Sequence, residues 1–174
     1  SNGDDYTPPH YQKVEEGPYV VNTYQAFASY TPQLTKVLEG RTLKAGEFSF
    51  ELYSVSDGGE EELLETVTNA ADGTVTFTPL PFGARGLGNT RVFHIREKAP
   101  ETLETGMTYS PLEVELSIAI SDNGENDGTL ILTPSYDPEN PEFENTYAAS
   151  GELPAGVWAT KVLNGRTLQA GEFS

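Results

Sequence analysis

Three residues of different chemistry occupy positions where strand alternation calls for apolar side chains: an amine (Lys36), a carboxylic acid (Glu97) and a carboxamide (Asn145). Successive side chains of a strand point to opposite faces, so each of the three shares a face with its apolar neighbours. Those neighbours are Leu34, Leu38, Phe93, Ile95, Phe143 and Tyr147. Burying an isolated charge or amide is costly, so three such residues on three strands predict one shared buried site.

The three groups together could form a covalent bond. Burial disfavours the charged form of a lysine, which makes a neutral, nucleophilic amine accessible at Lys36. A buried Glu97 can stay protonated, donate a hydrogen bond to the side-chain carbonyl of Asn145 and shuttle protons. Attack of the amine on the amide carbon, with loss of ammonia, would leave a Lys36–Asn145 isopeptide bond. Folding would supply the effective concentration that the reaction lacks in water, and the bond would join the first strand of the domain to the last.

Two simpler arrangements of the same residues remain open at this point. Lys36 could lay its aliphatic stem along the core and place its ammonium group in water. Alternatively, Lys36 and Glu97 could form a buried ion pair that never reacts. Glu47 and Glu51 face outward by the same alternation, so we expect them to be solvated and to take no part in the reaction.

The elements that must position these groups are short strands. Alternation with a period of two runs through seven segments, and clusters drawn from 17 glycines and 12 prolines separate them. The pattern is typical of an all-β, immunoglobulin-like antiparallel β-sandwich with about seven strands. Helix is hardly supported anywhere, and Glu60–Val67 is the one segment whose assignment stays open. The seven predicted strands lie at residues 34–38, 48–52, 75–77, 92–97, 112–120, 130–136 and 143–147.

A sequence motif occurs twice, and the separation between its two copies gives the length of one domain. Residues 35–49 read TKVLEGRTLKAGEFS and residues 160–174 read TKVLNGRTLQAGEFS, which differ at two positions. A period this long is a whole domain, so the pattern indicates an array of similar domains. We predict the tail of a preceding repeat in residues 1–24, one complete repeat in 25–149, and a linker with the head of the following repeat in 150–174.

The incomplete repeats would each carry one half of a site. Asn22 is equivalent to Asn145, because Asn-Thr-Tyr occurs at residues 22–24 and again at 145–147, and the TKVL motif makes Lys161 equivalent to Lys36. Asn22 and Lys161 each lack their two partners. The head strand of one molecule could pair with the tail strand of another and imitate the array, but we expect no covalent bond there. Linkers are predicted at Gln25–Gln33 and Ala148–Ala159.

Composition excludes several classes of function. The net charge is −17, and such a field repels nucleic acid and anionic membrane surfaces. The sequence contains no apolar run of 18 residues that could span a membrane. The chain has no cysteine, which is compatible with both extracellular and cytosolic locations. We predict no cofactor.

Metal binding is not predicted either. The two histidines are His94, which faces outward, and His10, in the leading segment. Asp122–Gly128 carries acidic and amide residues but not the ligand spacing of an EF-hand, so a hairpin turn is the better interpretation.

The ordered combination of motifs resembles a known family. It resembles the streptococcal-type pilin isopeptide-linkage domains, which are related to the collagen-adhesin B-type domains of Gram-positive surface proteins. The resemblance implies an immunoglobulin-like sandwich in a cell-wall-anchored pilin or adhesin. It also implies that Lys36 and Asn145 form the bond and that Glu97 promotes it. The motifs that carry it are KVLEGRTLKAGEFSFEL, NAADGTVTF, FHIRE, SDNGENDGTL and FENTY, over residues 34–147.

The sequence departs from that family in two ways. Leu153–Gly156 lacks the threonine of an LPxTG sorting signal, and no Tyr-Pro-Lys-Asn type pilin motif is found. These departures favour a multi-domain adhesin stalk, secreted and held at the cell wall, over a pilus backbone subunit. Neighbouring repeats of the same chain are the expected partners.

The alternative function is an adhesive module that binds a host glycan or matrix protein. A patch of aromatic side chains on the outward faces would support this alternative, but the tyrosines are scattered along the sequence. Enzymatic activity is not predicted, because the sequence shows no catalytic set of residues.

Overall fold

The structure, a computed structural model, describes residues 26–125 and 127–149 of the chain. Within them it has one short 3-10 helix, η1 (Ala84–Gly86), and is otherwise built from strands. The strands are β1 (Phe27–Tyr30), β2 (Gln33–Glu39), β3 (Ser49–Val55), β4 (Glu61–Thr68), β5 (Thr74–Thr76), β6 (Leu80–Gly83), β7 (Thr90–Lys98), β8 (Met107–Thr108), β9 (Glu113–Asp122), β10 (Leu130–Asp137) and β11 (Glu142–Tyr147).

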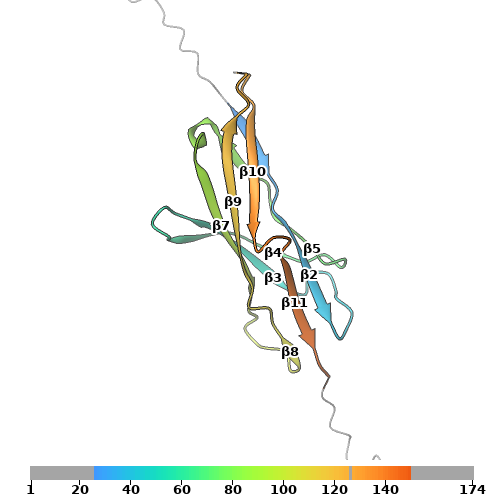
Figure 1. Ribbon diagram of the computed structural model, residues 1–174. Coiled ribbons are helices and arrows are strands. Elements are labelled where there is room, and N and C mark those ends of the chain that lie inside the picture. The colour runs from blue at the N-terminus through green and yellow to red at the C-terminus, as the bar shows by residue number, and fades with distance from the viewer. Residues whose placement is uncertain (1–25, 126, 150–174) are drawn as a thin grey trace, which may run out of the picture.

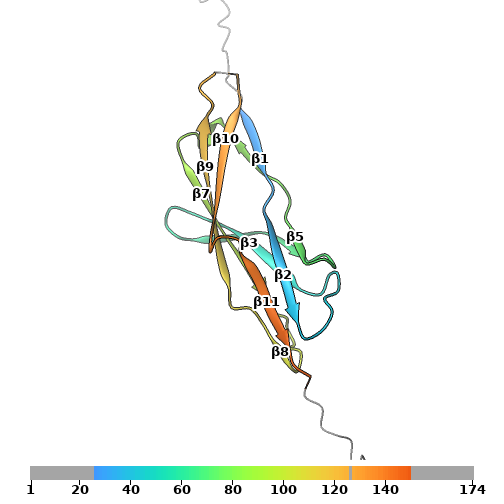
Figure 2. The same ribbon diagram turned by 45° about the vertical axis from the view of Figure 1, so that its right-hand side comes forward.

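Two principal sheets enclose the core of an elongated domain (Figure 1). One has the order β10-β9-β7-β3-β4 and the other the order β5-β2-β11-β8, while β1 and β6 form a separate two-stranded ribbon. β1 begins at one end of the domain and β11 ends at the opposite end (Figures 1 and 2). The predicted all-β, immunoglobulin-like sandwich is therefore confirmed, and the structure shows where its two ends lie.

Alternation along the strands builds the core. In β9, Val114, Leu116, Ile118 and Ile120 are all buried, while Glu113 and Glu115 face outward. The same period in β3 and β7 adds Phe50, Leu52, Phe93 and Ile95 from the same sheet. The facing sheet contributes fewer apolar side chains, namely Leu34, Val75 and Phe143. Two inward positions of that sheet are polar instead, Lys36 and Asn145.

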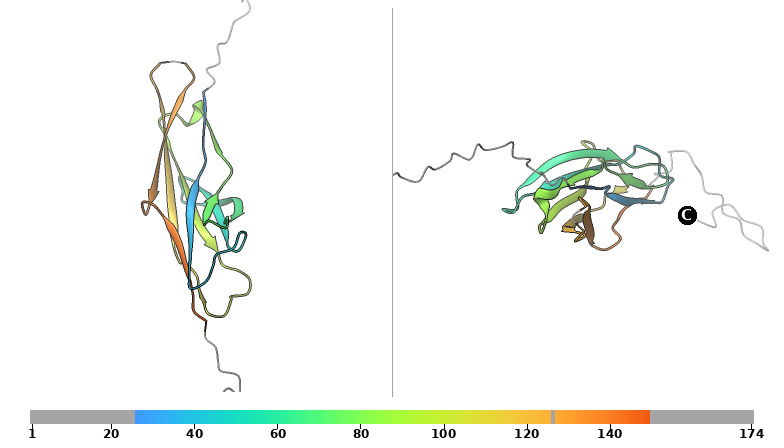
Figure 3. Two further views of the ribbon diagram at one scale, coloured as in Figure 1. Left: turned by 90° about the vertical axis from the view of Figure 1, so that its right-hand side faces the viewer. Right: turned by 90° about the horizontal axis from the view of Figure 1, so that it is seen from above.

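β2 and β11 are hydrogen-bonded neighbours and run parallel, unlike every other strand pair among the described residues. In Figures 2 and 3 the blue strand β2 and the orange strand β11 lie side by side and run in the same direction. Nearly the whole domain lies between them in sequence, as a parallel pair requires a long connection. The prediction that Lys36 lies on the first strand was wrong, because β1 precedes β2.

The segment predicted as a linker, residues 25–33, belongs to the domain wherever the structure describes it. β1 pairs with β6 along its full length. Ala26 is buried, and Ala28 and Tyr30 pack on the core. The linker prediction was wrong because a strand of four residues is too short to show a clear period of two.

Strands are more numerous than predicted because four of them have weak patterns. β1, β6 and β8 have only two to four residues each. β4 is an edge strand with exposed residues on both faces, which explains why Glu60–Val67 left the assignment open. The predicted hairpin at Asp122–Gly128 is confirmed, since β9 and β10 pair antiparallel on either side of it. Within the described residues, no helix has the length and apolar character needed to cross a membrane.

Candidate functional site

The pairing of β2 with β11 places Lys36 and Asn145 on neighbouring strands. In this parallel register Phe143 is the partner of Lys36, and Asn145 is the partner of Leu38. Both polar residues face the core, where Lys36 is 2% exposed and Asn145 is 0% exposed. Glu97 reaches them from β7 of the opposite sheet, and its side chain is 2% exposed. The structure thus brings together the three residues that the sequence predicted to share one site.

A single carboxyl group contacts both prospective reactants. The Nζ of Lys36 donates a hydrogen bond to Oε2 of Glu97 at 2.8 Å. The Nδ2 of Asn145 donates to Oε1 of the same group at 2.6 Å. The alternative in which Lys36 places its ammonium group in water is wrong, because its side chain is fully buried and its amine ends on Glu97.

The carbonyl oxygen of Asn145 has a different partner from the one expected. The backbone N–H of Ser110 donates a hydrogen bond to Oδ1 of Asn145 at 2.7 Å. A backbone N–H can only donate, so the oxygen of the amide must face Ser110 and its nitrogen must face Glu97. The expectation that Glu97 donates to this carbonyl was therefore wrong for the conformation in the structure.

One aromatic ring lies over the amine, and other rings pack in the same core. The Phe48 ring centroid lies 4.4 Å from Nζ of Lys36, and Tyr109 meets Phe48 edge-on at 6.3 Å. In the same core, the rings of Phe50 from β3 and Phe143 from β11 of the opposite sheet pack 5.1 Å apart. Such surroundings strengthen every electrostatic interaction inside them.

Burial changes the proton affinity of the amine. Removal of Lys36 from water lowers its pKa below the ordinary value of 10.5, and the hydrogen bond to Glu97 opposes this effect without cancelling it. The neutral amine is therefore more accessible at Lys36 than at a lysine on the surface. A neutral amine is the form that can attack a carbonyl carbon.

The backbone of Lys36 is held by a turn that precedes β5. Its N–H donates to the carbonyl oxygen of Gly73 at 2.7 Å. Gly73 has a φ of +90°, and a Cβ atom there would lie 2.3 Å from the carbonyl oxygen of Lys36. Only glycine allows this close approach, so Gly73 helps to fix the position of β2.

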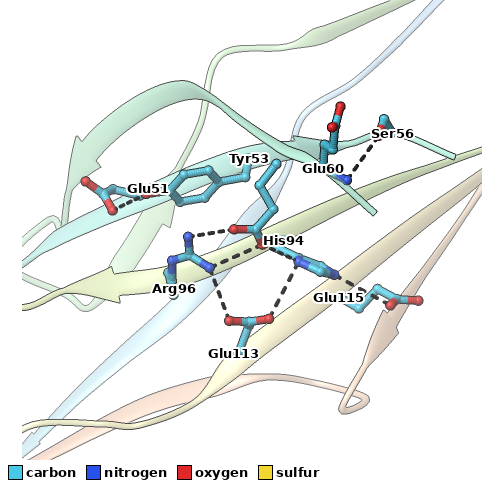
Figure 4. A network of polar contacts seen from close by, with 9 residues as sticks. Glu51, Tyr53, Ser56, Glu60, His94, Arg96, Glu113 and Glu115 are labelled. Carbon is cyan, nitrogen blue, oxygen red and sulfur yellow. Dashed lines mark hydrogen bonds and ion pairs between the residues drawn. The ribbon is translucent and has the colours of Figure 1, made fainter. Parts of the chain in front are cut away.

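A second polar network lies on the outer face of the five-stranded sheet (Figure 4). Arg96 contacts Glu61 at 2.8 Å and Glu113 at 3.2 Å, and its guanidinium group lies 4.0 Å from the Tyr53 ring centroid. His94 Nδ1 lies 2.6 Å from Oε1 of Glu61. His94 thus faces outward, as predicted, and joins a charged network across β4, β7 and β9.

The outer network contains side chains of the kinds that bind metals. One ligand atom from each of Glu61, His94 and Glu113 lies within 4.8 Å of the others. Sequence reasoning treated His94 alone and missed this grouping. Arg96 already contacts both carboxylates, so a divalent cation would have to compete with its guanidinium group.

Some predicted residues lie outside the described part of the chain. The half-sites Asn22 and Lys161 belong to this group, as does His10. Three residues that contact the site were missed by sequence reasoning, namely Phe48, Gly73 and Ser110. Gly73 could have been found from the Asp72-Gly73 turn signal, whereas Ser110 contributes a backbone group that leaves no mark in the sequence.

The fold and the buried site together define a class of protein: an immunoglobulin-like sandwich whose core holds hydrogen-bonded lysine, glutamate and asparagine side chains. The family of Spy0128-like isopeptide-containing domains, FctA, matches residues 32–148. The chain belongs to this family, which is a structural, pilin-type family of Gram-positive surface proteins rather than an enzyme family. No curated protein matches the chain.

Proposed function

We propose that the domain is a load-bearing unit in the shaft of a Gram-positive adhesin or pilin, stabilised by a self-formed isopeptide bond between Lys36 and Asn145. Glu97 acts as the proton shuttle. The observation that carries this proposal is the double contact of one carboxyl group, whose two oxygens lie 2.8 Å from the amine and 2.6 Å from the amide nitrogen.

The reaction follows from those two contacts. Oε2 of Glu97 takes a proton from the Lys36 ammonium, and the freed lone pair of Nζ attacks Cγ of Asn145. The carboxylic acid then turns so that the proton on Oε2 reaches Nδ2, and its other oxygen takes one proton from Nζ. The Cγ–Nδ2 bond breaks, its electron pair leaves with ammonia, and the carbonyl double bond forms again.

Folding provides most of the advantage for this reaction. Groups held in reacting geometry gain an effective concentration on the order of 10⁵–10⁸ M. The buried site also excludes bulk water, which would otherwise solvate the amine and compete for the tetrahedral intermediate. Both reactants belong to the same chain, so the chemistry happens once per molecule and the domain is not an enzyme in the ordinary sense.

The bond would route force around the domain. β1 begins at one end and β11 ends at the other (Figure 1). With Lys36 joined to Asn145, tension entering through β1 and β2 passes directly to β11, and residues 37–144 carry no load. The cross-link also restricts the unfolded chain, as a disulfide does over a loop of similar length, which is worth about 5 kcal/mol.

The location and the partners follow from this role. A shaft domain acts outside the cell, so the chain is secreted and anchored to the wall in its parent protein. Its partners are neighbouring repeats of the same kind, with residues 1–24 and 150–174 as parts of those repeats. Asn22 and Lys161 each belong to a site shared with those repeats, and any pairing between the end segments of different molecules stays non-covalent.

Intact mass spectrometry of the chain tests the proposal. The expected mass is that of the sequence less one ammonia. Glu97→Gln preserves shape but cannot shuttle the proton, so this variant should keep the ammonia while far-ultraviolet circular dichroism shows it folded. Glu113→Gln, on the surface, is the matched control and should still lose ammonia. A folded wild-type chain with the full sequence mass would contradict the proposal and leave an unreacted ion pair as the function of the site.

A further inference from the structure

The carbonyl oxygen of Asn145 is where negative charge develops when Lys36 attacks. In the tetrahedral intermediate this oxygen becomes an oxyanion, and reactions of this type are accelerated by hydrogen-bond donors fixed around it. Glu97 does not supply such a donor in the structure, since its two oxygens contact nitrogen atoms. The donor to Oδ1 is the backbone N–H of Ser110 at 2.7 Å.

We propose that the backbone N–H of Ser110 is the oxyanion-stabilising donor of the linkage reaction. This inference rests on the proposed function of the same site. It divides the work between two groups: Glu97 moves protons between the two nitrogen atoms, and Ser110 holds the oxygen. The hydrogen bond strengthens as charge builds on Oδ1, because bonds to an ionised acceptor are about twice as strong as neutral ones.

The N–H of Ser110 is free for this task because the strand ladder ends before it. β8 pairs with β11 only through Met107 and Thr108, so Ser110 lies two residues past the last ladder position. Pro111 follows and has no N–H of its own to offer. The Asn145 side chain accepts the N–H of Ser110 that would otherwise be left without a strand partner.

The donor is also rigidly held, which an oxyanion site requires. The Tyr109 ring packs edge-on against Phe48, and its hydroxyl accepts a hydrogen bond from the N–H of Glu104 at 3.2 Å. On the other side, Oγ of Ser110 accepts the N–H of Leu112 at 3.3 Å. Because Phe48 also lies against the amine of Lys36, one aromatic ring sets the positions of both nucleophile and donor.

The decisive experiment replaces the Ser110 amide by an ester in the full chain. The corresponding α-hydroxy acid removes the N–H and keeps the side chain. The chain is assembled by chemical ligation in denaturant, so that it first folds on dilution. Ammonia loss is then followed by mass spectrometry and folding by circular dichroism. We expect linkage to slow by about 10²–10³-fold, the usual cost of losing one oxyanion donor.

Two controls separate this effect from general damage. Ser110→Ala keeps the N–H and loses only the contact from the Leu112 N–H to Oγ, so it should link much faster than the ester chain. An ester at Phe77 removes a different buried backbone hydrogen bond, from its N–H to the carbonyl oxygen of Pro32 at 3.0 Å. That ester should cost stability and leave the rate of linkage in folded molecules unchanged. An ester at Ser110 that folds and links as fast as the wild-type chain would overturn the inference.

A second measurement applies even where the ester chain fails to fold. In Lys36→Met the reaction is blocked, and magnetic resonance can detect coupling across the hydrogen bond from the Ser110 nitrogen to Cγ of Asn145. Detection supports the inference, and absence of the coupling with rapid exchange of the Ser110 N–H overturns it. Failure of the wild-type chain to lose ammonia would contradict the proposed function itself. The outcomes of the ester and magnetic resonance experiments concern the role of Ser110 alone.

Discussion

Two charged clusters of this domain use hydrogen bonds of the same length in opposite surroundings. Lys36 and Glu97 lie 2.8 Å apart in the core, and Arg96 and Glu61 lie 2.8 Å apart on the outer face of the sheet. The side chains of the first pair are 0% and 2% exposed, and those of the second are 32% and 28% exposed. The distance between the charged groups therefore does not distinguish the two pairs. Any difference in their behaviour must come from their surroundings.

The surroundings act in opposite directions on the two cations. Burial lowers the pKa of Lys36, whereas the hydrogen bond to Glu61 raises the pKa of Arg96. The first cation is pushed toward a neutral amine that can react, and the second is held as a permanent charge. Arginine keeps its proton in proteins, so the outer cluster offers no nucleophile. The comparison separates a buried pair whose surroundings favour a neutral amine from an exposed pair whose cation keeps its charge.

Replacing each cation by methionine should give the largest difference between the clusters. Lys36→Met removes the nucleophile, so the chain keeps its ammonia and loses the cross-link, at a cost of about 5 kcal/mol of unfolding free energy. Arg96→Met breaks exposed ion pairs, which are worth less than about 1 kcal/mol. Urea unfolding of the two variants beside the wild type measures both. Equal losses in the two variants would show that burial does not distinguish the clusters.

The support of the buried cluster can be broken without touching its polar side chains. In Gly73→Ala the added Cβ would meet the carbonyl oxygen of Lys36 at 2.3 Å, at a residue whose φ is +90°. Strain of this kind costs on the order of 1–3 kcal/mol. We also expect slower ammonia loss, because a misplacement of about 1 Å can reduce the rate of such reactions by about 10²-fold.

Gly59→Ala is the matched control for that variant. Gly59 also has a positive φ, +82°, but a Cβ there meets no atom within 4 Å. It therefore carries the conformational strain alone, and its linkage rate, followed by mass spectrometry after first folding, should equal that of the wild type. If the two alanine variants link at the same rate, the close contact with Lys36 does not position the reactant.

Strand parity, that is, whether a residue stands at an odd or an even position along its strand, was enough to predict the buried cluster. Lys36, Glu97 and Asn145 each continue an apolar stripe, and side-chain direction in a strand depends only on odd or even position. The repeat added independent weight, because the motifs around Lys36 and Asn145 occur twice. These signals are local, so they survive without knowledge of which strands are neighbours.

Strand neighbours and loop backbones could not be predicted in the same way. The outer cluster depends on register, since Arg96 lies opposite Glu113, and His94 opposite Glu115, only once β7 pairs with β9. Parity placed His94 outward but could not say what it would meet. Ser110 is the extreme case, because its contact with Asn145 uses a backbone N–H that every residue except proline possesses.

The smallest expected difference between the clusters is in how their contributions to stability change in acid. Hydrogen bonds from Arg96 and then His94 lower the pKa of Glu61 below its ordinary value of 4.5. The folded state thus favours the carboxylate, so Glu61 stabilises the fold above pH 4.5 and loses this contribution as the pH falls through the folded-state pKa. The melting temperature of Glu61→Gln should lie slightly below that of the wild type at neutral pH, and the gap should close in acid.

The same gap should shrink with added salt, because exposed charges are screened. Glu62→Gln, next to Glu61 on β4, removes a carboxylate outside the network and is the matched control, which should melt with the wild type at neutral pH. The gap for Lys36→Met should behave differently and persist in acid and in salt, since an isopeptide bond carries no proton to lose. A Lys36→Met gap that closes with the Glu61→Gln gap would mean that the buried pair acts through charge alone.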